Sequence, residues 1–338
     1  MVQPRPGPRN LITDVEGIAV GQAEDAGVRS GVTVILPDRP AVCAVDVRGG
    51  GPGTRETDAL APETLVPTVD AITLAGGSMY GLAAADGVAA WLGARRRGYV
   101  VIPREDVPPS PIVPGAILFD LGNGGDKQWG LEPPYRALGL AAVEAAGEAF
   151  ALGSAGAGYG AMAGRLKGGT GSASVVTEGM TVGALAAVNS FGSVVAPGTR
   201  AFWAAPFELE GEFGGLGAAA LAAAPGDYWT KELAAPRANT TIAVVATDLS
   251  LTPAQARRVA VMAQDGLARA IRPVHAPFDG DVVFALSTGR LPPPEAADAA
   301  VMQAGALAAD CLSRAVARAV YEAQAPWAGP LAWRDLAP

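Results

Sequence analysis

Short β-branched and apolar runs alternate with helical segments rich in alanine and glycine along most of the 338 residues. Glycine, proline and aspartate bound the runs, as is typical of strands. The pattern predicts helices that cover β-sheet, and because half of the residues are hydrophobic, a sizeable core can form. We expect strands at 32–36, 41–47, 71–74, 99–102, 116–119, 182–189, 241–247 and 281–288.

Helical spacing and end signals predict the helices between these strands. One helix opens after Gly76-Gly77 and stops before Gly98. Thr252-Pro253 supplies an N-cap and a proline at the first helical position of another. We expect helices at 78–97, at 135–152, from 253 onward and at 295–323, whereas 197–238, rich in glycine and proline, is the least regular segment.

The composition argues against several classes of partner. A formal net charge of −8 disfavours nucleic acid or an anionic membrane, because both reward clustered lysine and arginine. Cys43 and Cys311 lie in apolar surroundings without metal-ligand spacing, so we expect reduced core cysteines and no metal or organic cofactor. The N-terminus lacks an apolar signal region, and no apolar run approaches the roughly 18 residues of a membrane span, so we expect a cytoplasmic protein.

Asn239-Thr240-Thr241 stands directly before an apolar strand, in a chain with one histidine. With so little imidazole available, a hydrolase would need another base for a hydroxyl nucleophile. The α-amino group of a residue freed by backbone cleavage is one such base, and Thr240 is the candidate. The alternative is that the three residues form only a polar turn at the entry of a strand.

Asp279 and Asp281 flank Gly280 just before another predicted strand. Two carboxylates one residue apart could orient a nucleophile and its ammonium partner. A calcium-like or merely turn-forming Asp-Gly-Asp is the competing interpretation, although a turn needs at most one short polar residue and the second carboxylate then has no evident structural task. His275, four residues before Asp279, is more simply structural.

Two further polar residues interrupt apolar or glycine-rich stretches. Lys167 and Asn189 could each donate a hydrogen bond to a developing oxyanion, or be ordinary turn residues.

The run 156–161 matches the G-x-G-x-x-A pattern, yet it follows a predicted helix instead of a strand, so a dinucleotide site is not expected. The glycines at 49–53 indicate only a backbone that turns tightly.

Taken together, these motifs resemble the self-processing N-terminal-nucleophile hydrolases. That family includes the L-aminopeptidase/D-esterases, the β-peptidyl aminopeptidases and the endo-type 6-aminohexanoate-oligomer (nylon oligomer) hydrolases. The resemblance covers about 10–323, and threonine after asparagine together with Asp-Gly-Asp is closer to the nylon-oligomer branch. It is carried by the sequence DAITLAGGSMYGL at 70–82, GAG at 156–158, KGG at 167–169, VN at 188–189, NTT at 239–241 and FDGD at 278–281.

The resemblance implies a role for each matching residue. Thr240 would be both the residue after the scissile bond, with Asn239 before it, and the nucleophile. Asp279 and Asp281 would orient it, Asn189 would lie on the oxyanion side, Tyr80 would stand near the site, and Lys167 would hydrogen-bond the nucleophile region. Arg165 is the alternative to Lys167, because the spacing there varies between branches.

The resemblance also implies a fold and an assembly. The expected fold is a four-layer α/β/β/α sandwich, formed by a single domain over 1–338 that is cleaved into chains 1–239 and 240–338. Such chains usually form tetramers of cleaved protomers. The expected activity is hydrolysis of amide bonds in short peptides or 6-aminohexanoate oligomers through an acyl-enzyme. An aminopeptidase or esterase for D-, L- or β-amino acid amides, an acyltransferase and a non-catalytic binding protein are the alternatives.

Overall fold

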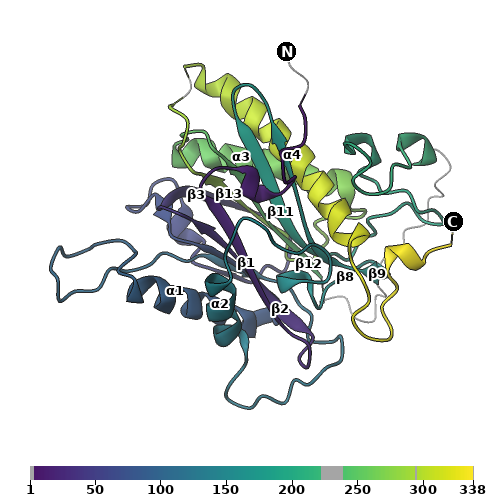
Figure 1. Cartoon of the computed structure of the whole chain (residues 1–338), viewed down its shortest axis with the longest axis horizontal. Helices are drawn as coiled ribbons and strands as arrows, with labels where there is room; N and C mark the ends of the chain where they lie inside the picture. Colours follow the sequence, from purple (N-terminus) through teal and green to yellow (C-terminus); the bar gives the residue numbers. More distant parts are fainter. Residues whose placement is uncertain (1–3, 222–238, 294, 338) are drawn as a thin grey trace.

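Two β-sheets lie face to face in the computed structural model, which describes residues 4–221, 239–293 and 295–337 (Figure 1). The first sheet has five strands in the order β1-β2-β6-β7-β4, and the second has six in the order β10-β11-β12-β13-β3-β5. Strands of the first sheet are β1 (Ile18–Asp25), β2 (Ser30–Pro37), β6 (Ile72–Ala75), β7 (Gly115–Ile117) and β4 (Thr54–Arg55). Strands of the second are β10 (Gly169–Val176), β11 (Thr181–Asn189), β12 (Thr240–Thr247), β13 (Val282–Ser287), β3 (Ala41–Val47) and β5 (Thr68–Val69), and β8 (Met162–Ala163) pairs separately with β9 (Leu166–Lys167).

Helices cover the outer face of each sheet. Helices α1 (Ala84–Ala94) and α2 (Tyr135–Glu144) pack on the five-stranded sheet, and α3 (Pro253–Ala270) and α4 (Ala297–Tyr321) pack on the six-stranded sheet (Figure 1). Three separate apolar cores fill the three interfaces, one between the sheets and one under each helical layer. The four-layer α/β/β/α arrangement is therefore confirmed.

Strand β12 shows why the sequence folds in this way. All of its eight residues are buried, because one face meets the other sheet and the opposite face meets the helices. Ile242 and Val244 lie in the core between the sheets, whereas Ala243 and Val245 lie under α3 and α4. A continuous apolar run is what a strand covered on both faces requires.

The starts of α2 and α3 are as expected, whereas α4 runs from Ala297 to Tyr321 instead of from 295 to 323, and two other helices differ more. The segment 78–97 begins as a 3₁₀ helix (Ser78–Ala83) and becomes α1 only from Ala84 to Ala94. Helix α2 ends at Glu144 instead of at residue 152, because Gly147 then turns alongside β1 and exchanges hydrogen bonds with Val20. Helix α3 starts at the predicted Thr252-Pro253, where the Thr252 side chain accepts a hydrogen bond from the Gln255 amide.

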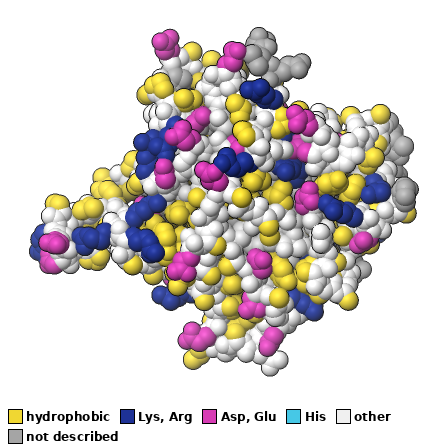
Figure 2. All heavy atoms as spheres, in the orientation of Figure 1, with side chains coloured by type: hydrophobic (Ala, Val, Ile, Leu, Met, Phe, Trp, Pro, Cys, Tyr) yellow, Lys and Arg dark blue, Asp and Glu magenta, His cyan; other side chains and the backbone are white. Residues whose placement is uncertain are grey.

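The strand β1 and the short strands β4, β5, β8 and β9 were not expected, and two further strand assignments are informative. The expected strand 99–102 is not one: Tyr99 forms only an isolated bridge with Ser110, and the following residues extend into solvent (Figure 2). Strand β10 was not predicted, because its residues 169–174 are glycine, threonine, serine and alanine, which suggest a loop. These small residues let α4 approach the sheet closely, since a Cβ at Gly171 would overlap the Ala315 carbonyl oxygen.

Cys43 and Cys311 are buried and unpaired with each other, as expected, in two different cores. Across the described ranges, no helix is both long and apolar enough to span a membrane. The part of the irregular segment 197–238 that follows residue 221 lies outside the described residues.

Candidate active site

One end of the six-stranded sheet brings together residues from three neighbouring strands. Thr240 is the first residue of β12, and the antiparallel pairing with β11 places Asn189 directly opposite it. On the other side β13 runs parallel to β12, and Asp281 immediately precedes β13. Thr240, Asn189 and Asp281 are 3%, 2% and 1% exposed, so polar groups from distant parts of the chain meet in a buried place.

The hydroxyl of Thr240 lies beside the peptide bond that precedes it. Its Oγ1 donates a hydrogen bond to the carbonyl oxygen of Asn239, which is also buried. The backbone of Gly280 approaches the same hydroxyl, because a Cβ at that position would lie 2.6 Å from Oγ1. The glycine between the two aspartates therefore leaves room for the Thr240 side chain.

Asp281 connects the strand start to the histidine of the chain. Its Oδ1 accepts a hydrogen bond of 2.8 Å from the backbone N–H of Thr241. Its Oδ2 lies 2.8 Å from His275 Nδ1 and accepts a second bond from the His275 backbone N–H at 3.1 Å. The sequence suggested only a structural histidine, whereas the structure places its ring on a carboxylate of the candidate site.

Asp279 is held in a similar way. Its two carboxylate oxygens accept hydrogen bonds from the backbone N–H groups of Phe191, at 3.2 Å, and Ala276, at 3.1 Å. The expectation that one carboxylate has no structural task is therefore wrong, because each of Asp279 and Asp281 binds backbone donors of neighbouring segments. The orienting role that the sequence predicts for them stays a prediction.

The glycine run 49–53 closes over this Asp-Gly-Asp turn. The Gly51 N–H donates to the Asp279 carbonyl oxygen at 2.8 Å, and a Cβ at Gly49 would overlap the Asp281 amide nitrogen. These glycines therefore allow their own backbone to pack closely against the backbone of the Asp-Gly-Asp turn near Thr240. The sequence alone did not assign them to the site, because glycine runs have many uses.

Lys167 and Asn189 are connected through one residue, Met162, which contacts both. The Asn189 Oδ1 accepts a bond from the Met162 N–H at 2.9 Å, and Met162 pairs with Lys167 between β8 and β9. Lys167 is fully buried, and its Nζ donates to the carbonyl oxygens of Gly158, Ala161 and Gly168 at 2.7 to 3.0 Å. Arg165 is exposed, and the choice between it and Lys167 as the basic residue of the site stays a prediction.

Tyr80 belongs to the 3₁₀ helix that starts near Asn189. The Asn189 Nδ2 donates to the Phe119 carbonyl oxygen at 2.9 Å, and the neighbouring Leu118 carbonyl accepts from the Ser78 N–H. Tyr80 is 49% exposed, and its ring contacts Trp129 edge-on at 5.5 Å. Among the described residues it makes no hydrogen bond or ring contact with Thr240, and its role in the site stays a prediction.

A buried carboxylate that the sequence did not single out lies behind this helix. Asp120 accepts hydrogen bonds of 2.7 Å from the Gly77 N–H and from the Ser30 hydroxyl. Burial raises the pKa of Asp120 despite these bonds. Its only sequence signal was its position, one residue beyond the expected strand 116–119.

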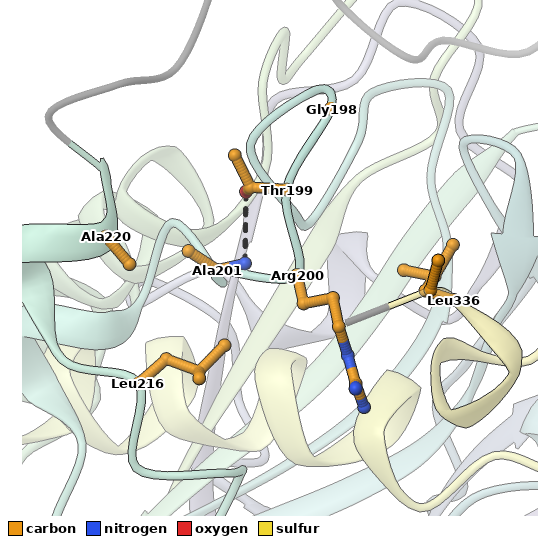
Figure 3. A pocket seen from close by; sticks show the side chains of 8 residues that line it. Gly198, Thr199, Arg200, Ala201, Leu216, Ala220 and Leu336 are labelled. Atoms are coloured by element: carbon orange, nitrogen blue, oxygen red, sulfur yellow. Dashed lines mark hydrogen bonds between the residues drawn. The ribbon is translucent and has the colours of Figure 1, made fainter.

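A pocket of about 660 Å³ lies in another part of the molecule (Figure 3). Gly198, Thr199, Arg200 and Ala201 form one wall, and Leu216, Ala220 and Leu336 approach from other segments. None of the six predicted catalytic residues lines it. Within the described ranges, no cluster of three or more histidine, cysteine or acidic residues could hold a metal ion.

Comparison with known proteins identifies the family. The model of "Peptidase family S58" matches residues 10–328. The chain belongs to peptidase family S58. Membership of S58 makes it a hydrolase that acts on peptide or amide bonds, consistent with the resemblance seen in the motifs.

Relatives of this S58 chain carry different names. An uncharacterised aminopeptidase of Mycobacterium bovis is 48% identical, and the match covers 97% of this chain and 98% of that protein. A 6-aminohexanoate-oligomer endohydrolase of Kocuria sp. is 30% identical, over 84% of this chain and 77% of the relative.

Solved structures confirm the fold of this S58 chain. The L-aminopeptidase D-Ala-esterase/amidase of Ochrobactrum anthropi, described as a variant of the Ntn-hydrolase fold, superposes with a TM-score of 0.70 at 24% identity, over 96% of this chain and 89% of that one. A β-aminopeptidase of Burkholderia sp. gives a TM-score of 0.69 at 24% identity, with 96% and 89% coverage.

Proposed function

We propose that this protein is a self-processing amidohydrolase whose nucleophile is Thr240, freed by cleavage of the Asn239–Thr240 bond. The observation that carries the proposal is the hydrogen bond from Thr240 Oγ1 to the Asn239 carbonyl at the buried start of β12. A hydroxyl held against the carbonyl of its own preceding residue is placed for attack on that bond. A simple turn at a strand entry would not need such burial of both residues.

Maturation needs no reagent besides water. Thr240 Oγ1 attacks the Asn239 carbonyl carbon, the C–N bond breaks as its nitrogen takes a proton, and an ester links the two residues. Water then hydrolyses the ester, which gives chains 1–239 and 240–338. The Thr240 nitrogen, an amide before cleavage, becomes an α-amine.

Turnover follows from the new amine. An α-amine has an unperturbed pKa of about 7.7–8.0, so it can take the hydroxyl proton near neutral pH as Thr240 attacks a substrate amide. It then returns a proton to the leaving nitrogen, and water releases the acyl group. The hydrogen bond from the Thr241 N–H to Asp281 supports an orienting role of this carboxylate beside the amine, and the pairing of Asn189 with Thr240 in the sheet supports a role of Asn189 on the oxyanion side.

Lys167 supports the site in a different manner. Its ammonium binds three backbone carbonyls, which fixes the glycine-rich turns next to Asn189. We therefore assign it a positioning role within the proposal. Tyr80, half exposed at the 3₁₀ helix, would stand where substrate enters.

The proposed substrates are short amides, either N-terminal amino acid amides and peptides or 6-aminohexanoate oligomers. The aminopeptidase name of the relative at 48% identity favours the first, and the endohydrolase name of the relative at 30% identity favours the second. The proposal includes a homo-oligomer of cleaved protomers, a tetramer by resemblance, in the cytoplasm. It includes no nucleic acid, membrane or cofactor.

Intact mass and N-terminal analysis of the purified protein test the cleavage. We expect a new terminus at Thr240 and two chains that stay associated, no processing in Thr240→Ala, and retained processing in Thr240→Ser. Thr241→Val is the matched control, because the buried Thr241 hydroxyl has no hydrogen-bond partner within the described part of the chain and valine keeps its shape. A single intact chain in the wild type, or a terminus at another residue, would refute the proposal.

A substrate panel then separates the alternatives. D-, L- and β-amino acid amides are compared with 6-aminohexanoate oligomers, each with and without an added amine acceptor. Release of free acid without acceptor is expected for a hydrolase. Product that appears only when an amine is added would instead identify an acyltransferase.

A further inference from the structure

His275 is the one histidine of the chain, and the structure places both of its donors on a single carboxylate oxygen. Asp281 Oδ2 lies 2.8 Å from the ring nitrogen Nδ1 of His275 and 3.1 Å from its backbone nitrogen. The other oxygen, Oδ1, accepts the Thr241 N–H at 2.8 Å. Asp281 therefore connects the imidazole to the peptide group that directly follows Thr240.

The backbone at His275 is arranged for this double contact. Its φ angle is +55°, in the left-handed region that residues other than glycine seldom adopt. The next residue, Ala276, exchanges hydrogen bonds with Asp279, donating to the carboxylate at 3.1 Å and accepting the Asp279 N–H at 2.9 Å. An uncommon conformation that the surrounding structure holds in this way is typical of functional sites.

Attachment of this segment does not by itself require an imidazole. The His275 backbone N–H already bonds Asp281 Oδ2, so the ring adds a second donor to an oxygen that has one. The Asp281 side chain is 2% exposed and the imidazole 20%, so the ring reaches solvent whereas the carboxylate does not. Donors of this kind stabilise a buried carboxylate as an anion, and each further donor also restricts its rotation.

Donation to a carboxylate fixes where the imidazole carries its proton. An ionised carboxylate only accepts hydrogen bonds, so Nδ1 must carry the hydrogen, and in the neutral ring Nε2 then carries none. The hydrogen bond persists when the ring is protonated, because Nδ1 is a donor in both forms.

A carboxylate held in this way matters once Thr240 is freed. An anion that rotates toward the new α-ammonium pairs with it and keeps it protonated, whereas the amine must be unprotonated to accept the Thr240 hydroxyl proton. We propose that His275 is a positioning residue whose ring holds Asp281 Oδ2, so that Oδ1 alone binds the start of β12. The inference rests on the proposed function and deepens it, because it states how Asp281 orients the nucleophile without trapping the base.

A matched pair of substitutions separates the donor from the rest of the side chain. Asparagine and aspartate have the same shape and both tolerate the left-handed backbone, but only His275→Asn can donate to Asp281 Oδ2. His275→Asn should therefore restore nearly the wild-type rates of maturation and turnover. His275→Asp sets a second carboxylate against the first, and it should lower both rates at least about tenfold by misplacing Asp281.

Glu210 provides the controls for these changes, because it is exposed and also left-handed, with φ at +53°. Neither Glu210→Asn nor Glu210→Asp should change either rate.

The pH dependence of kcat/KM distinguishes positioning from a loss of stability. Its acid limb reports the ionisation of the base in the free enzyme. In His275→Asp the released Asp281 and the added carboxylate both stabilise the ammonium, so the limb should move to higher pH, and in His275→Asn it should stay in place. Partial unfolding lowers the rate without moving the limb. The variants leave unchanged the other charged groups around the site: Asp279, Lys167, Arg48 and Asp46.

Nitrogen NMR of protein that contains isotope-labelled histidine tests the hydrogen bond itself, because a single histidine gives unambiguous signals. In the neutral ring the proton should be on Nδ1. A proton on Nε2, or equal rates and equal acid limbs in His275→Asn and His275→Asp, would overturn the positioning role while leaving cleavage at Thr240 intact. A wild type that stays uncleaved and inactive would instead refute the proposed function, and the positioning role with it.

Discussion

At the scale of single residues, Gly280 has the sharpest steric requirement in the candidate site. A Cβ there would lie 2.6 Å from Thr240 Oγ1 and 2.8 Å from the Gly51 carbonyl oxygen. Both separations are shorter than side chains tolerate, so Gly280→Ala must displace the hydroxyl or the glycine loop. We expect the rates of maturation and turnover to fall by at least about a hundredfold, because misplacement by about 1 Å has that effect.

Gly179→Ala is the control for this change, since a Cβ there meets nothing within 4 Å. Mass spectrometry over time measures maturation, and initial rates measure turnover. Normal processing in Gly280→Ala would show that the Thr240 hydroxyl does not need its present position.

Asp279 and Asp281 are expected to affect the chemistry when each is changed to asparagine. Each substitution removes the negative charge beside the predicted nucleophile, and we expect both rates to fall by at least about a hundredfold, as for loss of an acid–base group. Both carboxylates also accept backbone hydrogen bonds, so stability has to be measured in the same variants. If a variant keeps normal rates, or if its slow rate is explained by unfolding alone, that aspartate is structural.

At the scale of elements, Asp120 links the end of β7 to the 3₁₀ helix that carries Tyr80. Burial raises its pKa, so the native state holds this proton more tightly than the unfolded chain does. The stability that follows from the tighter proton is therefore present below the ordinary aspartate pKa of about 3.9 and is lost as the pH rises through the native value. Asp120→Asn should thus gain stability relative to the wild type as the pH rises from about 4 to 7.

Thermal melts of the two proteins across this range measure the effect. The difference in melting temperature should grow with pH and then level off. A difference that does not change with pH would mean that Asp120 ionises in the native state as it does in the unfolded chain.

Helix α4 holds the segment before residue 222 through a buried ion pair. Glu212 Oε2 lies 3.0 Å from Arg314 Nη2, and the two side chains are 7% and 1% exposed. Removal of one charge leaves the other buried, so Glu212→Gln should lower the free energy of unfolding by about 3–5 kcal/mol. Glu322→Gln, which breaks the more exposed pair with Arg334, should cost about 1 kcal/mol or less.

Urea unfolding of both variants in the uncleaved Thr240→Ala background compares them without the complication of two chains. Equal stability of the two variants would show that the Glu212 pair contributes no more than a surface contact.

Elements with a clear local pattern could be predicted, and those shaped by distant partners could not. The strand 240–247 and the start of α3 have a continuous apolar run and a complete cap, both readable from neighbouring residues. Strand β10 has small residues because α4 packs onto it, and that contact joins segments far apart in sequence. The apolar residues 99–102 have strand propensity, but among the described residues only Tyr99 finds a partner, in an isolated bridge with Ser110, because the segment is exposed to solvent.

The same distinction applies to the candidate site. Thr240, Asn189 and Asp281 could be nominated from motifs, but their meeting depends on the register of β11 against β12 and the parallel pairing of β13. The contact of His275 with Asp281 could be found only in the structure, because a single histidine near two aspartates has no diagnostic spacing in the sequence.

At the scale of the whole molecule, the proposed cleavage would divide the six-stranded sheet in an unusual way. Strands β12 and β13 would belong to the small chain, and they lie between β11 and β3 of the large chain. Neither chain alone could form the six-stranded sheet, although the five-stranded sheet lies wholly in the large chain. We expect the mature protein to refold after denaturation at a rate that depends on concentration, whereas Thr240→Ala refolds independently of concentration.

Recovery of native fluorescence after dilution from urea, at several protein concentrations, checks this expectation. Mature protein that refolds at the same rate at every concentration would show that its two parts assemble without a bimolecular step.

The position of Thr240 in the middle of a sheet has a consequence for precision. Chain ends ordinarily fray, because their backbone groups have few partners. A terminus created at Thr240 would instead begin inside a ladder, with Asn189 on one side and the start of β13 nearby on the other. Its amine would be located as accurately as a core atom, and any opening of this strand would switch the activity off.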